Sequence, residues 1–191
     1  MVKTQKMSTQ TLVTGAVLTA LVIVIQSMAA YIKFATPMAW ALILIVIGTA
    51  TCGKFMGAWL GLVFGVAILL TPGGADPFFT LNPIATTIIV LLKGTMCGFL
   101  SGYVYEICYK LSKKNIYLST LSASVVCPLV NTGIFILGCF IFFFSDIQKL
   151  SGGNAIYTIF IVYAGINFIV ELTLNIILAP VVVRILNALK K

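Results

Sequence analysis

The chain has 191 residues, of which 61% are hydrophobic and only 8% are charged, and its mean hydropathy is +1.15. A soluble domain of this length could not bury so much apolar surface, so the chain is expected to be an all-α integral membrane protein. The formal net charge of +8 then reflects the orientation of membrane loops rather than a nucleic-acid partner.

Apolar stretches long enough to cross a bilayer, separated by proline, glycine and clustered charges, predict six transmembrane helices in a single membrane domain, residues 1–191. The six spans are expected at residues 9–32, 37–52, 54–71, 83–110, 117–144 and 154–187. The second and third spans are the shortest, and the junction between them at Gly53 and Lys54 is very tight.

An even number of spans places both termini on one side of the membrane. With both termini in the cytoplasm, nine of the twelve Lys and Arg residues lie inside, only Lys33 and Lys149 lie outside, and Lys93 lies within a span. Because short cytoplasmic loops are enriched in Lys and Arg, this asymmetry predicts that both termini are cytoplasmic.

The first predicted helix begins like a secretory signal peptide. Lys3 and Lys6 precede an apolar run, and Ser27-Met28-Ala29 forms a small-x-small cleavage pattern. Cleavage would leave five spans and would spoil the sorting of the basic residues. A retained helix is therefore favoured, with cleavage as the open alternative.

Ala16 and Ala20 share one face of this helix, beside Gly15 and Thr19. Small residues at a spacing of four let another helix approach closely. In the cytoplasmic half of the span, this patch is a candidate docking surface for a membrane partner.

The stretch GTATCGKF, from Gly48 to Phe55, matches most of a phosphate-binding loop but has Phe55 where Ser or Thr must bind magnesium. It also joins two membrane helices, whereas a phosphate loop follows a strand. No other stretch resembles a nucleotide site, so any ATP-driven step requires another polypeptide.

Two glycine ladders follow, each with a spacing of four residues. The ladder in the third span contains Gly53, Gly57, Gly61 and Gly65, and the one in the fourth contains Gly94, Gly98 and Gly102. Each ladder forms a groove on one helix face that lets a second backbone approach closely. We expect these helices to pack within the chain, with an external interface as the alternative.

The connection TPGGADPFFTLNP, from Thr71 to Pro83, is the longest expected outside the membrane and is rich in turn-forming residues. Such a loop could fold over a pocket and place Phe78 or Phe79 on a ligand. Both phenylalanines would serve equally well as interfacial anchors.

Polar residues within the spans are the main functional signal, because each needs a partner or a cavity. Lys93 lies near the centre of the fourth span, Asn131 follows Pro128 in the fifth, and Asn167, Glu171 and Asn175 form a stripe on the sixth. A rise of about 1.5 Å per residue places Lys93 and Glu171 at similar depths. They could form a structural ion pair, floor a cavity that opens outward, or do both.

Other chemistries lack their usual residues. The chain has no histidine, no pair of carboxylates in one helix and no nucleophile beside a base, so an enzyme is not expected. The five cysteines are scattered without a C-x-x-C pair, so neither a metal site nor a cofactor is expected.

Several of these features resemble the substrate-binding S components of energy-coupling factor (ECF) vitamin transporters. They are the six spans, the Ala16/Ala20 pair, the loop before the fourth span, and NPIATTIIVLLKG from Asn82 to Gly94. CPLVNTGIFILG (Cys127 to Gly138) and GINFIVELTLNIILAP (Gly165 to Pro180) are most similar to the pantothenate-type branch.

The resemblance implies high-affinity capture of a vitamin, with pantothenate as the best candidate, in an outward cavity formed mainly by the last three spans. It implies a bacterial cell membrane location and three partners, a membrane coupling subunit that meets Ala16 and Ala20 and two cytoplasmic ATPases. The residues that it places near the ligand are Asn82, Thr86, Lys93, Asn131, Tyr163, Asn167 and Glu171, with Phe78 and Phe79 from the loop. Lys93 would suit the pantothenate carboxylate.

Two alternatives stay open at this point. The chain could serve another vitamin or precursor, of the folate, riboflavin or pyridoxine type. It could also be a non-transporting membrane assembly protein whose polar residues only hold the helices together.

Overall fold

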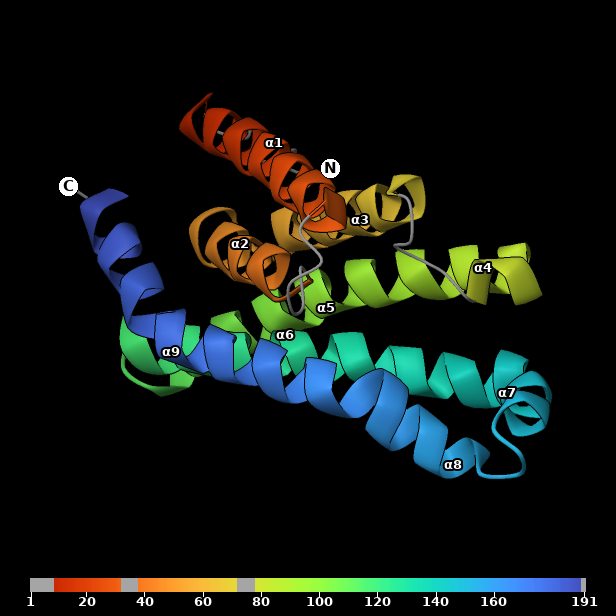
Figure 1. Cartoon of the computed structure of the whole chain (residues 1–191). Helices are drawn as coiled ribbons and strands as arrows, with labels where there is room; N and C mark the ends of the chain where they lie inside the picture. The colour runs from red at the N-terminus through yellow and green to blue at the C-terminus, as the bar shows by residue number, and fades with distance from the viewer. Residues whose placement is uncertain (1–8, 32–37, 72–77, 190–191) are drawn as a thin grey trace, which may run out of the picture.

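The computed structural model describes residues 9–31, 38–71 and 78–189, which form helices and turns with no strand among them. In chain order the elements are α1 (Thr9–Tyr31), α2 (Met38–Cys52), α3 (Lys54–Leu70), α4 (Phe78–Leu81), α5 (Pro83–Leu111), α6 (Ile116–Gly138), the π-helix η1 (Cys139–Phe143), α7 (Phe144–Leu150), α8 (Ala155–Tyr157), the π-helix η2 (Thr158–Gly165) and α9 (Ile166–Leu189) (Figure 1). The expected all-α class is confirmed. Residues 32, 37 and 72–77, which fall at span ends and in the expected outer loop, lie outside the described residues.

Four helical stretches are long and apolar enough to cross a membrane, namely Thr9–Met28, Pro83–Leu111, Ile116–Leu150 and Ala155–Ala188. The apolar helices Trp40–Cys52 and Lys54–Leu70 are shorter. The expected second and third spans therefore exist as helices without reaching full membrane length by themselves. The six-span count stays a prediction.

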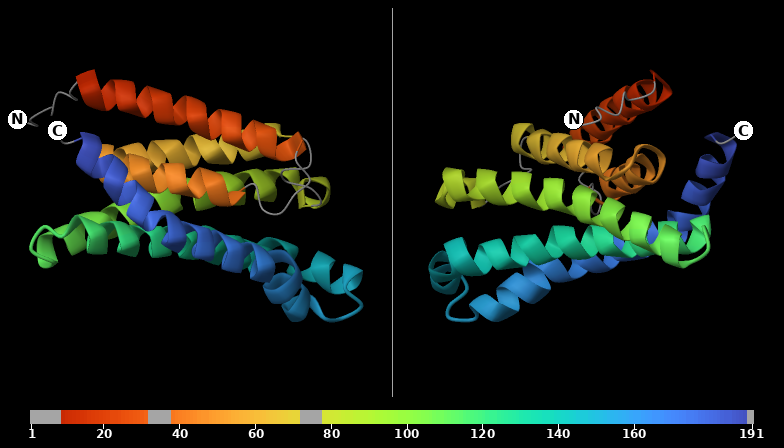
Figure 2. Two further views of the ribbon diagram at one scale, coloured as in Figure 1. Left: turned by 60° about the vertical axis from the view of Figure 1, so that its left-hand side comes forward. Right: turned by 180° about the vertical axis from the view of Figure 1, so that it is seen from behind.

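The helices form layers (Figures 1 and 2). Helices α5, α6 and α9 run side by side, α3 packs on α5, and α1 lies across α2 and α3. The start of α1, the end of α9 and the α5–α6 turn lie at one end of the molecule, which we call the terminal end. Helices α4, α7 and α8 lie at the opposite end, which we call the loop end.

The α3–α5 contact is built from the two glycine ladders. A Cβ atom on Gly61 would collide with the carbonyl oxygen of Gly94, and one on Gly57 would lie 2.6 Å from the carbonyl oxygen of Gly98. A Cβ atom on Gly65 would lie 2.9 Å from the carbonyl oxygen of Val90. The backbones touch because no side chain separates them, so the expected packing within the chain is confirmed for Gly57, Gly61 and Gly65 against α5. Gly53 precedes α3 as its N-cap, and a Cβ there would contact nothing within 4 Å.

An ion pair ties the same two helices together at the terminal end. Lys54 Nζ donates to Glu106 Oε2 at 2.9 Å, and Lys54 Nζ lies 5.6 Å from the centroid of the Tyr103 ring. Lys54 is therefore both an ion-pair partner and a packing residue at the tight junction between α2 and α3.

Candidate polar layer and aromatic cluster

The register of α5 against α6 determines which polar residues meet inside the bundle. The two helices are antiparallel neighbours. Gly138 of α6 lies against Ile89 of α5, and Cys127 of α6 and Cys97 of α5 are buried in the same core cluster. Lys93 is one turn before Cys97, and Asn131 is one turn after Cys127. This register therefore brings Lys93 and Asn131 to the same level.

Glu171 joins this level from α9. Asn131 Nδ2 donates to Glu171 Oε2 at 3.4 Å, and Asn175 Nδ2 donates to the backbone oxygen of Glu171 at 2.8 Å. Lys93, Asn131 and Glu171 are exposed by only 5%, 3% and 2%. We call these three residues the polar layer. The structure thus brings together three of the residues that the sequence analysis placed near a ligand.

Lys93 does not form a direct ion pair with Glu171. Among the described residues, Lys54 and Glu106 are the only pair within ion-pair distance. The Lys93 ammonium instead faces the Phe135 ring, with Nζ 5.3 Å from the ring centroid, while Asn131 holds the Glu171 carboxylate. The two charges interact only at longer range, so a buried cation and a buried anion both keep bonding capacity for a third group.

The polar layer and Asn175, one turn further along α9, also have unused acceptors. Asn131 Oδ1 and Asn175 Oδ1 are buried and accept no hydrogen bond within the described part of the chain. Leaving a buried acceptor unpaired costs about 1–3 kcal/mol. Native proteins therefore keep few such atoms, and these two oxygens are available to accept from a third group.

An aromatic cluster covers the layer on the side of the loop end. The Phe78 ring, at the start of α4, packs edge-on against Phe135, Phe143 and Tyr163, with ring centroids 5.4, 5.2 and 5.1 Å apart. Phe135 therefore contacts both Phe78 and the Lys93 ammonium. Phe79, its neighbour in sequence, is 42% exposed. The two candidate phenylalanines thus have different environments, and only Phe78 is part of this cluster.

Replacement of Phe78 by leucine should lower the thermal stability, because three edge-on aromatic contacts are lost. Each such contact stabilises by about 0.5–1.5 kcal/mol beyond area burial, so a loss of roughly 2 kcal/mol or more is expected. Phe79→Leu is the matched control and should unfold close to wild type in the same detergent. Equal melting temperatures for the two variants would show that the Phe78 contacts do not stabilise the protein.

The remaining candidate residues bond to local backbone groups. Asn82 is exposed and caps α5, where its Oδ1 accepts from the Ala85 N–H at 3.1 Å. Thr86 is buried but donates to the Asn82 carbonyl oxygen at 2.8 Å. Asn167 is exposed and donates to the Tyr163 carbonyl oxygen at 3.3 Å. They do not join the buried layer, and their contact with a ligand stays a prediction.

Phe135 is the contributor that sequence reasoning missed. It follows Asn131 by one helical turn, so it lies on the same face of α6 as a residue that had already been selected. That spacing was the available signal, but aromatic residues are frequent in this segment and the spacing alone could not single it out.

Two cavities lie elsewhere, and no residue of the polar layer lines either one. The larger, about 620 Å³, is an apolar groove between α1 and α3, lined by Leu12, Gly15, Ala16, Thr19, Ala20, Ile23, Phe55, Met56 and Trp59. Ala16 and Ala20 are exposed there, and Trp59 Nε1 donates to Thr19 Oγ1 at 3.2 Å across the groove. The small-residue patch of the sequence analysis is thus one wall of this groove, and α3 supplies the other.

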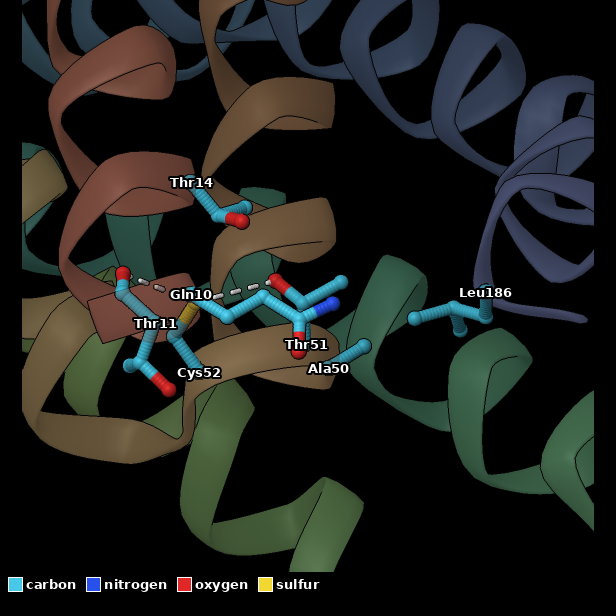
Figure 3. Close-up of a pocket in the computed structure, with 7 residues that line it drawn as sticks. All are labelled: Gln10, Thr11, Thr14, Ala50, Thr51, Cys52 and Leu186. Carbon is cyan, nitrogen blue, oxygen red and sulfur yellow. Dashed lines mark hydrogen bonds between the residues drawn. The ribbon is translucent and has the colours of Figure 1, made fainter. Parts of the chain in front are cut away.

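The smaller cavity, about 170 Å³, lies at the terminal end and is lined by Gln10, Thr11, Thr14, Ala50, Thr51, Cys52 and Leu186 (Figure 3). Cys52 Sγ donates to the Thr11 carbonyl oxygen at 3.8 Å, and Thr51 Oγ1 donates to Cys52 Sγ at 3.4 Å. The contact between Cys52 and Thr11 joins the start of α1 to the end of α2. No sequence signal indicated this pocket.

Comparison with known proteins gave one match. The family described as "ECF transporter, substrate-specific component" matches residues 10–183, nearly the whole chain. No curated protein and no solved structure matched the chain.

Proposed function

Since the chain belongs to the family of ECF transporter substrate-specific components, we propose that it captures a water-soluble vitamin, most specifically pantothenate, for ATP-driven uptake. Members of this family are membrane transport subunits that bind a substrate rather than enzymes. The observation that carries the proposal is the buried polar layer, in which Lys93 and Glu171 lie at one level without neutralising each other directly.

Pantothenate suits this layer by its functional groups. Its carboxylate would accept from the Lys93 ammonium, a charge-assisted hydrogen bond of the stronger kind. Its hydroxyl and amide N–H groups would donate to Asn131 Oδ1 and to the Glu171 carboxylate. Folate also carries carboxylates. Riboflavin and pyridoxine have none, so Lys93 could only donate an ordinary hydrogen bond to them.

The rim of the site would come from the loop end. Phe78 and Tyr163 contact each other beside Phe135 and would cover the apolar part of a vitamin. Phe79, Asn82, Thr86 and Asn167 would complete the rim, and their local hydrogen bonds would have to open for them to reach a ligand. Closure over a bound vitamin would bury its polar groups in the layer.

A thermal-shift screen of the purified protein against water-soluble vitamins tests this function. A ligand at one hundred times its Kd adds about 2.7 kcal/mol to the stability of the native state, so a true substrate should raise Tm clearly. Pantothenate is expected to give the largest shift. A larger shift with folate, riboflavin or pyridoxine would reassign the substrate within the family. If no vitamin in the panel raised Tm, the alternative of a non-transporting assembly protein would be favoured.

The same proposal includes an orientation with six spans and both termini in the cytoplasm. Apart from Lys93 and Lys149, the basic residues of the described part of the chain belong to the terminal end. They are Lys54 at the start of α3, Lys110 in the last turn of α5, Lys113 and Lys114 in the α5–α6 turn, and Arg184 near the end of α9. Lys149 lies at the loop end, in α7. The positive-inside rule therefore supports a cytoplasmic terminal end in a bacterial cell membrane.

A membrane coupling subunit and two cytoplasmic ATPases are the proposed partners, and the α1–α3 groove is the proposed contact surface for the coupling subunit. Ala16→Trp should block copurification of that subunit, because the indole would fill the groove where a partner helix approaches. Val17→Trp is the matched control, since Val17 is 54% exposed on the same helix and does not line the groove. Equal recovery of the coupling subunit with both variants would contradict this assignment.

A further inference from the structure

Three lysines without acidic partners lie at the α5–α6 junction, one in the last turn of α5 and two in the turn that follows. Lys110, Lys113 and Lys114 are all exposed, and within the described part of the chain none of them forms an ion pair. The acidic side chain on the same stretch of α5, Glu106, is bound to Lys54. The favourable interaction of a cation with a helix C-terminus accounts for Lys110 in the last turn of α5. It does not account for Lys113 and Lys114.

The backbone of this turn favours residues other than lysine. Lys113 and Lys114 have φ angles of 52° and 67°, in the left-handed region where glycine or asparagine is usual. The Lys114 N–H donates to the Tyr109 carbonyl oxygen at 3.0 Å, the pattern of a helix end that normally carries glycine. Lysine therefore occupies two positions where the backbone favours glycine or asparagine.

Apolar side chains flank the lysines directly. Leu111, the last residue of α5, is 79% exposed, and Tyr117 and Leu118, in the first turn of α6, are 46% and 48% exposed. Exposed leucine and tyrosine next to exposed lysine are typical of the region where a helix meets the lipid headgroups. A phospholipid would satisfy both kinds of side chain, with its acyl chains against the leucines and its phosphate on the lysine ammonium groups. A soluble acidic partner would leave the leucines exposed.

We propose that Lys110, Lys113 and Lys114 bind the headgroups of anionic phospholipids and hold the terminal end of the bundle at the lipid surface. The recognised chemistry is a phosphodiester with net negative charge, as in phosphatidylglycerol, with its acyl chains against Leu111 and Leu118. This site is distinct from the vitamin layer and does not depend on which substrate the protein binds.

Native mass spectrometry of the intact protein, released from micelles doped with phosphatidylglycerol or with phosphatidylcholine of the same chain length, tests the proposal. Wild type should retain phosphatidylglycerol preferentially. Each lysine near an anionic surface contributes about fivefold in affinity, so K113Q/K114Q should weaken phosphatidylglycerol binding about 25-fold. K113R/K114R should retain it, and Lys149→Gln at the loop end is the matched control that should leave it unchanged.

A second variant separates lipid binding from turn formation. K113G/K114G should be at least as thermostable as wild type in neutral micelles, because glycine adopts positive φ readily, yet should lose phosphatidylglycerol binding as K113Q/K114Q does. Equal retention of the two lipids by wild type, or unchanged phosphatidylglycerol binding in both double variants, would overturn the proposal. Loss of an ATPase subunit from the complex without any change in lipid binding would assign the lysines to a protein partner instead.

Discussion

Replacement of Gly61 by alanine is expected to destabilise the protein severely, although alanine is ordinarily the better helix former. In an open helix the change from glycine to alanine stabilises by roughly 0.5–1 kcal/mol. At Gly61 the added Cβ would collide with the Gly94 carbonyl oxygen, a backbone atom that no rotamer change can move. The added Cβ would push α3 away from α5 and lower the stability of the protein by more than about 2 kcal/mol. This loss should appear as a fall in Tm in detergent.

Gly133→Ala provides the matched control. Gly133 lies within α6, and a Cβ atom there would meet nothing within 4 Å. This variant should therefore show the opposite sign, with Tm equal to or above that of wild type. If both variants changed Tm in the same direction, the close backbone contact between α3 and α5 would not exist as described.

Lys93→Met is expected to weaken binding of a carboxylate-bearing vitamin by at least about 30-fold, the lower end of the effect of removing one partner of a buried charge pair. The stability of the ligand-free protein should change little or rise, because a buried charge without a direct partner is removed. Calorimetric titration gives the affinity, and thermal unfolding without ligand gives the stability. Lys149→Met, which removes an equivalent charge at the loop end, should match wild type in both.

The alcohol analogue of pantothenate, which lacks the carboxylate, isolates the contact itself. Wild type and Lys93→Met should bind this analogue with similar affinities if the Lys93 ammonium meets the carboxylate. A structural role for Lys93 predicts a different pattern, with a large loss of stability and weaker binding of both compounds. That pattern would restore the ion-pair interpretation that the sequence left open.

The main features of the fold could be predicted from the sequence because they are periodic. Apolar length predicted the helices, and a four-residue spacing predicted that Gly57, Gly61, Gly94 and Gly98 form close helix contacts. The fifth helical stretch continues to Leu150, six residues beyond the expected end of the fifth span at residue 144. Ile147 in this added stretch is buried in a hydrophobic cluster with Ile89 and Phe143.

The site was predictable only at the level of depth along each helix. Counting residues placed Lys93 and Glu171 at similar depths, but it could not give the rotation of each helix about its axis. Rotation decides that Lys93 meets Phe135 instead of Glu171, and that Asn167 is exposed while Glu171 is buried. Likewise, the Ala16/Ala20 patch could be predicted from the sequence of α1 alone. The opposite wall of the groove, from Phe55 to Trp59 in α3, depends on how the helices pack.

The central claim is that this chain binds one vitamin molecule through its polar layer, and equilibrium dialysis of the purified protein with labelled vitamins tests it most directly. We expect saturable binding at one molecule per chain, strongest for pantothenate and displaced by excess unlabelled pantothenate. Saturable binding of no vitamin in the panel, with a protein that is folded by thermal unfolding, would contradict the claim.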